Sequence, residues 1–235
     1  MTPSTVPDDH GFVKPVALFE ALDAEALASV HRAARVRRVE TAATFFREGD
    51  PATSFFLLND GSVKVTQLTP EGHQIVLRLI GRGDAFGGVA AFGGTTYPVT
   101  AEAVTDASAL EWSGEVMASL MERYPKLALN ALRFMGSRLH ELQVQYRQLA
   151  TEKVERRVAR ALLRLVEQSG RRVESGVLID LPLSRDDIAQ MTGTTLYTVS
   201  RIVSRFEADG ILEAGRQRVV IRDGHRLLKV ADDLI

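Results

Sequence analysis

Side chains that can contact nucleic acid are concentrated in one short stretch of the chain, residues 183–212. Arg201 has a forked guanidinium, and such a group can donate hydrogen bonds to both O6 and N7 of a guanine. The candidate base-contacting side chains just before it are Thr195, Leu196, Tyr197, Thr198 and Ser200. If one helix presents them on a single exposed face, they can read base edges in a DNA groove.

The same stretch predicts the two elements that would position these side chains. Apolar residues recur at helical spacing on both sides of a turn, namely Ile188, Ala189, Val199, Ile202, Val203 and Phe206. We expect helices over residues 185–191 and 195–208, with Gly193 in the turn because glycine adopts a left-handed conformation at little cost. Ser184 and Asp187 form a capping-box-like pair at the first helix. The pattern predicts a DNA-binding helix-turn-helix.

Four further residues are candidates for contacts with the DNA backbone. Ser184 and Arg185 start the first helix, and a helix N-terminus favours phosphate. Residues 215–232 predict a β-hairpin wing followed by a short terminal helix, and Arg216 and Arg218 lie on that wing. By contrast, we expect a solvated helix face for the three arginines Arg156, Arg157 and Arg160.

The region before residue 110 is predicted to be rich in short strands. Residues 1–16 contain three prolines and are expected to form a loose arm, and residues 18–34 one or two short helices. The β-rich segments are 44–46, 54–60, 62–68, 74–80 and 97–104, with turn signals between them. Short strands at near-regular spacing favour a small jelly-roll of about 90 residues. We assign residues 17–126 to this jelly-roll domain.

A long helix is predicted after the β-rich region, over residues 127–151. Its apolar residues form two rows with a period of seven: Leu132, Leu139 and Tyr146, then Met135, Leu142 and Leu149. This spacing is typical of a coiled-coil seam, so we expect the helix to pair in a homodimer. The alternative is that this face packs on the chain's own sheet. Residues 152–235 complete an α+β protein as a winged helix-turn-helix domain.

Composition restricts the classes of function. The chain has 235 residues, a net charge of −1 and no cysteine, which excludes disulfides, cysteine-ligated iron–sulfur clusters and a cysteine nucleophile. No apolar run approaches the roughly 20 residues that span a bilayer. The N-terminus also lacks the basic and apolar regions of a secretory signal. A cytoplasmic protein with no membrane partner is therefore expected.

Three motifs resemble one family of regulators. They are FREGDPATSFFLLNDGSVKV at 46–65, GRGDAFGGVAAF at 81–92 and EKVERRVARALLRL at 152–165. Together with the order of predicted domains, they resemble the family of the cyclic AMP receptor protein and the fumarate–nitrate reductase regulator. The resemblance implies a homodimeric transcription regulator that binds a roughly palindromic operator in double-stranded DNA and contacts RNA polymerase.

The resemblance fails where that family binds cyclic AMP. The glutamate for the ribose is replaced by Gly88, and the arginine and serine for the phosphate by Tyr97 and Pro98. A buried phosphate needs a cationic or multi-donor partner, so cyclic AMP is not expected. We therefore expect the sensor domain to respond to an effector other than cyclic AMP or an iron–sulfur cluster. Arg78 could point into the same cavity, or it could be a solvated barrel arginine. The candidate effector pocket comprises Val65, Leu77, Arg78, Gly87, Gly88, Val89, Tyr97, Pro98, Val99, Leu142 and Gln143.

Other sensor types of the family are weighed in the same way. Iron–sulfur sensing is excluded because no cysteine is present. Haem-based sensing of nitric oxide or carbon monoxide stays open, since any of five histidines could ligate iron: His10, His31, His73, His140 and His225. The sequence has no His-x-x-x-His pair, so histidine spacing does not indicate a metal site. An effector-independent regulator with a collapsed cavity is the further alternative, because residues 87–90, in the segment that would line the effector pocket, are small and apolar.

The resemblance also bears on DNA sequence preference and on catalysis. Arg201 matches the family arginine that contacts guanine, and Ser200 matches a serine of the fumarate–nitrate branch. Tyr197 replaces the family's glutamate, so a cytosine-facing acceptor is lost and a thymine methyl becomes a possible contact. A cupin-type enzyme is a remote alternative, because the predicted barrel lacks clustered metal ligands. We assign no catalytic residue and expect no enzyme.

Overall fold

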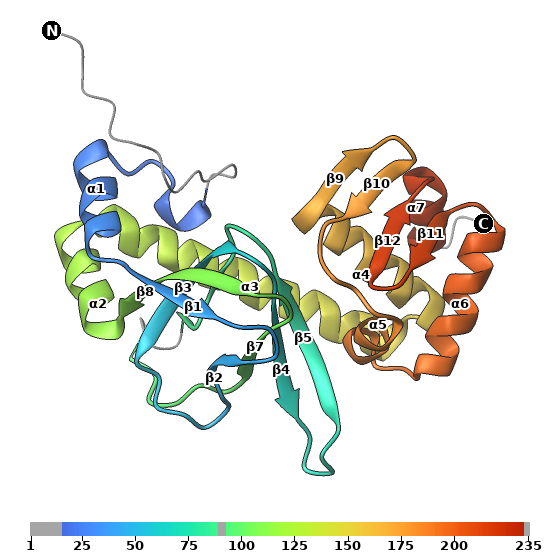
Figure 1. Cartoon of the computed structure of the whole chain (residues 1–235), viewed down its shortest axis with the longest axis horizontal. Coiled ribbons are helices and arrows are strands. Elements are labelled where there is room, and N and C mark those ends of the chain that lie inside the picture. Colours follow the sequence, from blue (N-terminus) through green and yellow to red (C-terminus); the bar gives the residue numbers. More distant parts are fainter. Residues whose placement is uncertain (1–15, 89–92, 233–235) are drawn as a thin grey trace, which may run out of the picture.

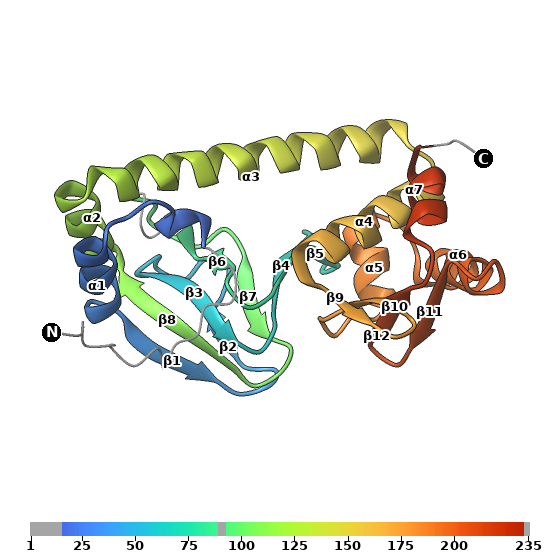
Figure 2. The same ribbon diagram turned by 90° about the horizontal axis from the view of Figure 1, so that it is seen from above.

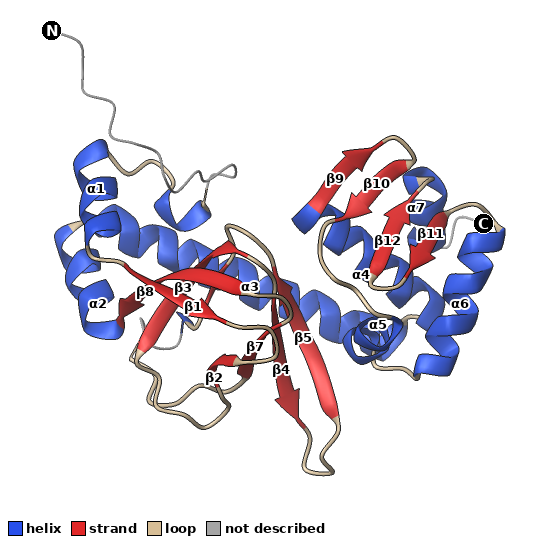
Figure 3. Ribbon diagram, viewed as in Figure 1, coloured by secondary structure: helices blue, strands red, loops and turns tan. Residues whose placement is uncertain are grey.

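The computed structural model describes residues 16–88 and 93–232. It has an N-terminal β-rich part, one long helix and a C-terminal part that contains the helix-turn-helix (Figure 1). Figure 3 shows how strands dominate the first part and helices surround the strands of the second. Residues 1–15 of the expected arm, together with His10 and Val89, lie outside the described residues.

Two antiparallel four-stranded sheets make the N-terminal barrel, in the orders β1-β8-β3-β6 and β2-β7-β4-β5. Their bounds are β1 (Arg35–Val39), β2 (Thr44–Phe46), β3 (Ser54–Asp60), β4 (Val63–Leu68), β5 (Gln74–Ile80), β6 (Ala85–Phe86), β7 (Thr100–Ala103) and β8 (Ala107–Ser113). The five predicted β-rich segments contain β2, β3, β4, β5 and β7. Gly61 links β3 to β4 at a φ of 86°, and a Cβ there would lie 2.3 Å from the Asp106 carbonyl oxygen, so only glycine fits.

Aromatic rings fill the space between the two sheets. The buried rings of Phe45, Phe56 and Phe86 have centroids 5.1–5.4 Å apart. The Phe46 ring stacks on Phe56 with centroids 5.9 Å apart. Such contacts combine large apolar burial with favourable ring geometry, which makes this cluster the centre of the barrel core.

Helices cover one end of the barrel and form a second core with it. Their bounds are η1 (Ala17–Phe19), α1 (Ala24–Arg32), α2 (Gly114–Arg123) and α3 (Pro125–Thr151). The Trp112 indole is buried here and donates to the Val30 carbonyl over 2.8 Å. The buried Asn130 side chain of α3 donates to the carbonyls of Leu18 and Glu20. The Trp112 bond therefore holds α1 on β8, and the Asn130 bonds hold η1 on the first turns of α3.

The rest of α3 runs along the barrel and continues to the C-terminal part (Figure 2). The seam residues Leu132, Met135, Leu139, Leu142, Tyr146 and Leu149 have exposed fractions of 44–76%. They therefore do not pack on the chain's own sheet, which was the alternative reading of the heptad pattern. In the described part of the molecule, none of the helices is long and apolar enough to cross a membrane.

The C-terminal part combines helices with a four-stranded antiparallel sheet in the order β11-β12-β10-β9. Its bounds are α4 (Val154–Ser169), β9 (Gly170–Val173), β10 (Gly176–Ile179), α5 (Arg185–Thr192), α6 (Leu196–Ala208), β11 (Leu212–Gly215), β12 (Arg218–Ile221) and α7 (Gly224–Asp232). The predicted wing is β11–β12, and α7 is the predicted terminal helix. The β9–β10 hairpin was not predicted, and it doubles the sheet on which the wing is built.

The expectation of a solvated arginine face on α4 is wrong. Arg157 donates from Nε to the Thr192 carbonyl at 3.0 Å and from Nη1 to the Glu152 carbonyl at 2.8 Å. Arg156 donates to the Ala231 carbonyl at 3.1 Å. Arg160 pairs with the carboxylates of Glu152 and Asp232. The three guanidinium groups are half-buried and satisfy carbonyl and carboxylate oxygens of neighbouring elements.

The barrel and the C-terminal part share contacts along β5. Val76 and Leu79 are buried in the same cluster as the core of the helix-turn-helix. Gln168 of α4 donates from Nε2 to the Leu79 carbonyl at 2.7 Å and to the Asp84 carboxylate at 2.6 Å. β5 therefore lies against α4 and α5, as Figure 2 shows.

Candidate nucleic-acid interface

The helix-turn-helix consists of α5, a tight turn and α6. The Ser184 hydroxyl accepts from the Asp187 amide at 3.0 Å, and the Asp187 carboxylate accepts from the Ser184 amide at 3.0 Å. This is the predicted capping box, which satisfies amide groups that the helix leaves without partners. Gly193 has φ 59° and ψ 48°, the left-handed conformation expected of the turn. α5 ends at Thr192, one residue later than predicted.

The buried face of α6 determines which of its side chains point into solvent. Among the apolar residues predicted to form the core, Ile188, Ala189, Val199, Val203 and Phe206 are all buried. Since α6 turns its Val199–Val203 side inward, the side chains half a turn away must point into solvent. The predicted reading face is thus a consequence of helix packing.

The first turns of α6 carry the exposed candidates for base contact. Thr195 precedes the helix, and its Oγ1 accepts from the Thr198 amide at 3.2 Å. Tyr197 is 71% exposed, and Leu196 is also exposed. The exposed Arg201 guanidinium carbon lies 5.9 Å from the centre of the Tyr197 ring, one turn earlier. These two side chains form one surface, whereas Ser200 is half-buried.

The candidate phosphate contacts differ in their partners. Arg185 Nη2 lies 3.3 Å from the Glu207 carboxylate of α6, so this guanidinium is held beside the N-terminus of α5. Arg218 Nη1 lies 3.5 Å from Glu213, which also accepts from Arg222. The hydrogen bond and charge of Arg222 lower the pKa of the Glu213 carboxyl, which therefore stays ionised. Arg216 at the wing tip is exposed.

Tyr97 is a core residue of the barrel. Its ring stacks on Phe46 with centroids 3.8 Å apart and planes 12° apart. Its hydroxyl donates to the Ser54 carbonyl at 2.6 Å and accepts from the Ser54 amide at 2.9 Å. Burial raises the pKa of this phenol. Tyr97 therefore occupies space between the sheets and uses both hydrogen-bonding capacities of its hydroxyl within the fold.

Arg78 takes neither of the two positions expected for it. It donates to the Ala85 carbonyl at 3.1 Å and pairs with Asp84 at 3.3 Å. Burial lowers the pKa of Arg78 to about 10, and Asp84 opposes that shift, so the group stays charged at neutral pH. With Leu77 it lines a pocket of about 370 Å³ between β5, α3 and α4 that also includes Arg138 and Glu141. Arg78 is thus a residue of the junction between barrel and helices.

The other candidate effector residues do not converge on this pocket. Val65 and Val99 are half-buried against the aromatic core of the barrel. The remaining described residues of the set, other than Leu77, Arg78 and Tyr97, are the half-buried Gly87 and Gly88 and the exposed Pro98, Leu142 and Gln143. The ten described residues of the set are therefore not brought together at one site.

The four described histidines are dispersed. His31 lies on α1, His140 on α3 and His225 on α7, while His73 lies between β4 and β5. Within residues 16–88 and 93–232, no three His, Cys, Asp or Glu side chains are grouped so that they could hold a metal ion.

Comparisons with known proteins identify the family. Residues 36–124 match the family model described as "Cyclic nucleotide-binding domain", and residues 156–230 match that of the "Crp-like helix-turn-helix domain". The chain belongs to the CRP/FNR family of transcription regulators, which are not enzymes, and it carries the family's DNA-binding helix-turn-helix.

Individual relatives cover most of the chain. The CRP-like cAMP-activated global transcriptional regulator of Mycobacterium tuberculosis is 24% identical over 91% of this chain and 96% of its own length. The transcriptional activator protein anr of Pseudomonas aeruginosa is 28% identical over 84% of this chain and 80% of its own. The structure of FixK2 from Bradyrhizobium japonicum is similar with a TM-score of 0.76 and 25% identity, covering 84% of this chain and 96% of that one. The α+β fold with an N-terminal β-rich domain, a long helix and a C-terminal helix-turn-helix is that of this family.

Proposed function

We propose that this regulator binds a roughly palindromic operator as a homodimer, with α6 in the major groove, and that its barrel does not take cyclic AMP. The observation that carries the DNA-reading part is the exposed Tyr197–Arg201 surface, opposite the buried Val199 and Val203. Arg201 contacts a guanine edge, and Tyr197 packs against a neighbouring base. Thr195, Leu196, Thr198 and Ser200 complete the contacts of α6.

Phosphate contacts hold α6 in register. Ser184 and Arg185 lie at the N-terminus of α5, where backbone amides and the helix dipole favour an anion. Arg216 and Arg218 of the wing reach the backbone next to the groove. We also propose RNA polymerase as its protein partner, because a regulator that activates transcription acts on that enzyme.

The homodimer is supported by the exposed seam of α3. Six large apolar side chains repeat with a period of seven and stay exposed along the helix. A soluble protein rarely leaves a contiguous apolar stripe of this kind in water. Pairing with α3 of a second copy buries the stripe as a coiled coil and provides two recognition helices for two half-sites.

The residues of the barrel favour DNA binding that does not depend on a cyclic nucleotide. The positions that would hold ribose and phosphate are Gly88, Tyr97 and Pro98, none of which can carry a positive charge. Five aromatic rings, including Tyr97, pack against one another between the sheets. This favours an effector-independent regulator over one with a nucleotide effector. A haem-dependent sensor is the second candidate function, and a Soret band in gently purified protein distinguishes it.

The test is selection of binding sites from random duplex DNA with purified, cofactor-free protein. The proposal expects two inverted half-sites whose centres are about 10 bp apart, one turn of the double helix. Enrichment of a single half-site, or no enrichment unless a ligand is added, would contradict the homodimer or the effector-independent sensor, respectively.

A further inference from the structure

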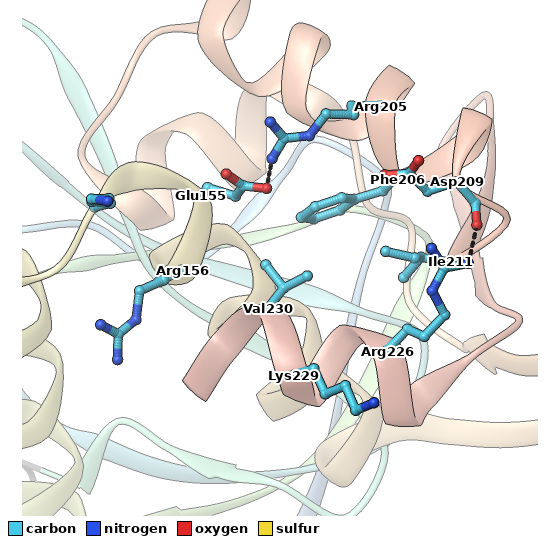
Figure 4. A pocket seen from close by; sticks show the side chains of 10 residues that line it. Glu155, Arg156, Arg205, Phe206, Asp209, Ile211, Arg226, Lys229 and Val230 are labelled. Carbon is cyan, nitrogen blue, oxygen red and sulfur yellow. Dashed lines mark hydrogen bonds and ion pairs between the residues drawn. The ribbon is translucent and has the colours of Figure 1, made fainter. Parts of the chain in front are cut away.

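A second concave site lies in the C-terminal part, away from the reading face. It is a pocket of about 820 Å³ between the start of α4, the end of α6 and α7 (Figure 4). Its floor is formed by Phe206, Ile211 and Val230. This volume is within the range of about 300–1,000 Å³ that small-molecule sites occupy. Sequence reasoning did not find the site, because its residues come from three separate segments.

The rim of this pocket is strongly cationic. Five basic side chains line it, namely Lys153, Arg156, Arg205, Arg226 and Lys229. Among the described residues that line it, two are carboxylates, and one of these, Glu155, is already paired with Arg205. The formal charge of the lining is about +3. An excess of guanidinium and ammonium groups around a concave site favours a ligand with several anionic oxygens.

Part of the rim is held in place and part has no anionic partner. Arg226 donates to the Asp209 carbonyl, and Arg205 is fixed by Glu155 (Figure 4). Lys153 and Lys229 are exposed, and no carboxylate of the described residues lies within ion-pair distance of either. A ligand can therefore use two ammonium groups without breaking an existing ion pair.

The position of the pocket separates it from the DNA surface. It lies at the C-terminal end of α6, whereas the groove is read from the N-terminal end. The 13-residue helix separates its two ends by about 20 Å at 1.5 Å per residue. The rim also includes Lys153, which follows Glu152, the residue at the end of α3. A ligand here contacts both the beginning of α4 and the recognition helix.

We propose that this pocket binds a small phosphorylated molecule with a diphosphate or larger anionic group. The phosphates contact Lys153, Arg226 and Lys229 at the rim, and Phe206 and Val230 provide an apolar floor. The site is additional to the reading of DNA, and its occupancy can be measured without operator.

The test is calorimetric titration of the full-length protein with inorganic pyrophosphate, ADP and adenosine. A salt concentration of about 0.15 M, with a Debye length of about 8 Å, suppresses weak surface binding. Pyrophosphate and ADP should give saturable binding, and adenosine should give none. The double variant K153A/K229A should raise the Kd at least about tenfold, equivalent to about 1.4 kcal/mol.

A variant with the same loss of charge provides the control. K126A/R172A removes two exposed positive charges from α3 and β9, outside the pocket. Its Kd for pyrophosphate should stay close to that of the wild type. Equal weakening in both variants, binding of adenosine alone, or no saturable binding up to about 1 mM pyrophosphate would overturn the proposal. The same holds if K153A/K229A lowers operator affinity and its salt dependence without a change in pyrophosphate binding, since the lysines would then contact DNA.

Discussion

Tyr197 and Arg201 are one turn apart on α6, so their side chains form a pair before DNA is bound. A guanidinium near an aromatic face gains about 0.5–1 kcal/mol at an exposed site. The contact restricts Arg201 to orientations along the exposed face of the helix. Less conformational freedom is then lost when the guanidinium meets a guanine edge.

Replacement of Arg201 by alanine should relax the sequence preference at one base pair, whereas replacement of Arg185 should mainly lower affinity. Loss of a bidentate base contact costs about 1–3 kcal/mol and relaxes the preference at one base pair. Loss of a phosphate contact weakens binding to all sequences and reduces the salt slope by about one unit. Fluorescence anisotropy on matched and mismatched operators across a salt series measures both effects. An equal loss on both operators for R201A would show that Arg201 does not read bases.

Replacement of Tyr97 by phenylalanine should destabilise the barrel. The hydroxyl satisfies both the amide and the carbonyl of Ser54, and a buried polar group left without a partner costs about 1–3 kcal/mol. Chemical denaturation followed by tryptophan fluorescence measures the free energy of unfolding. Y197F is the matched control, because Tyr197 is 71% exposed and the measurement is made without DNA, so it should have no measurable effect. Equal stability of Y97F and wild type would mean that the hydrogen bonds of the Tyr97 hydroxyl do not stabilise the barrel.

Sequence reasoning at this scale succeeds where the partners are close along the chain. The capping box of Ser184 and Asp187 spans three residues and could be predicted from their spacing. Arg157 could not be placed, because it binds the Thr192 carbonyl 35 residues away. That oxygen becomes a neighbour only when α4 packs against the end of α5. Arg78 was misplaced for the same reason, since its surroundings include residues of α3.

At the scale of elements, local pattern predicts the long helices and the hydrophobic strands. α3 and the strand β3 have the apolar spacing of their types. β1 was not predicted as a separate strand, because three of its five residues are arginines and only its last residue, Val39, is buried. β9 and β10 are four residues each and begin with glycine, so neither shows a strand pattern before it pairs.

Charge on the α3 seam should separate the two copies. L139E/L142E places two carboxylates on the exposed apolar stripe, where pairing would bring them close to their counterparts. We expect a monomer in analytical ultracentrifugation and weaker operator binding, because one half-site contact is lost. H140E/Q143E, with the same added charge at exposed positions of the same helix, should stay dimeric. A dimeric L139E/L142E variant would exclude this seam as the main interface.

At the scale of the whole molecule, the aromatic barrel and the missing phosphate partners should make the protein indifferent to cyclic AMP. Calorimetry with cyclic AMP should give no saturable heat, and operator affinity should be unchanged in its presence. Protein that binds the selected operator is the control for correct folding. A submicromolar Kd, about −8 kcal/mol or stronger, would contradict the effector-independent sensor.

Val76 and Leu79 of β5 are part of the helix-turn-helix core, so they couple the thermal unfolding of the barrel to that of the C-terminal part. Because these side chains are buried between the two parts, neither part can open without exposing apolar surface of the other. The chain should therefore show a single calorimetric transition whose van't Hoff and calorimetric enthalpies agree. The C-terminal segment expressed by itself should expose the surface that β5 covers and associate in solution. The folded barrel and DNA binding are thus lost together on heating, so unfolding of the barrel also ends binding to the operator.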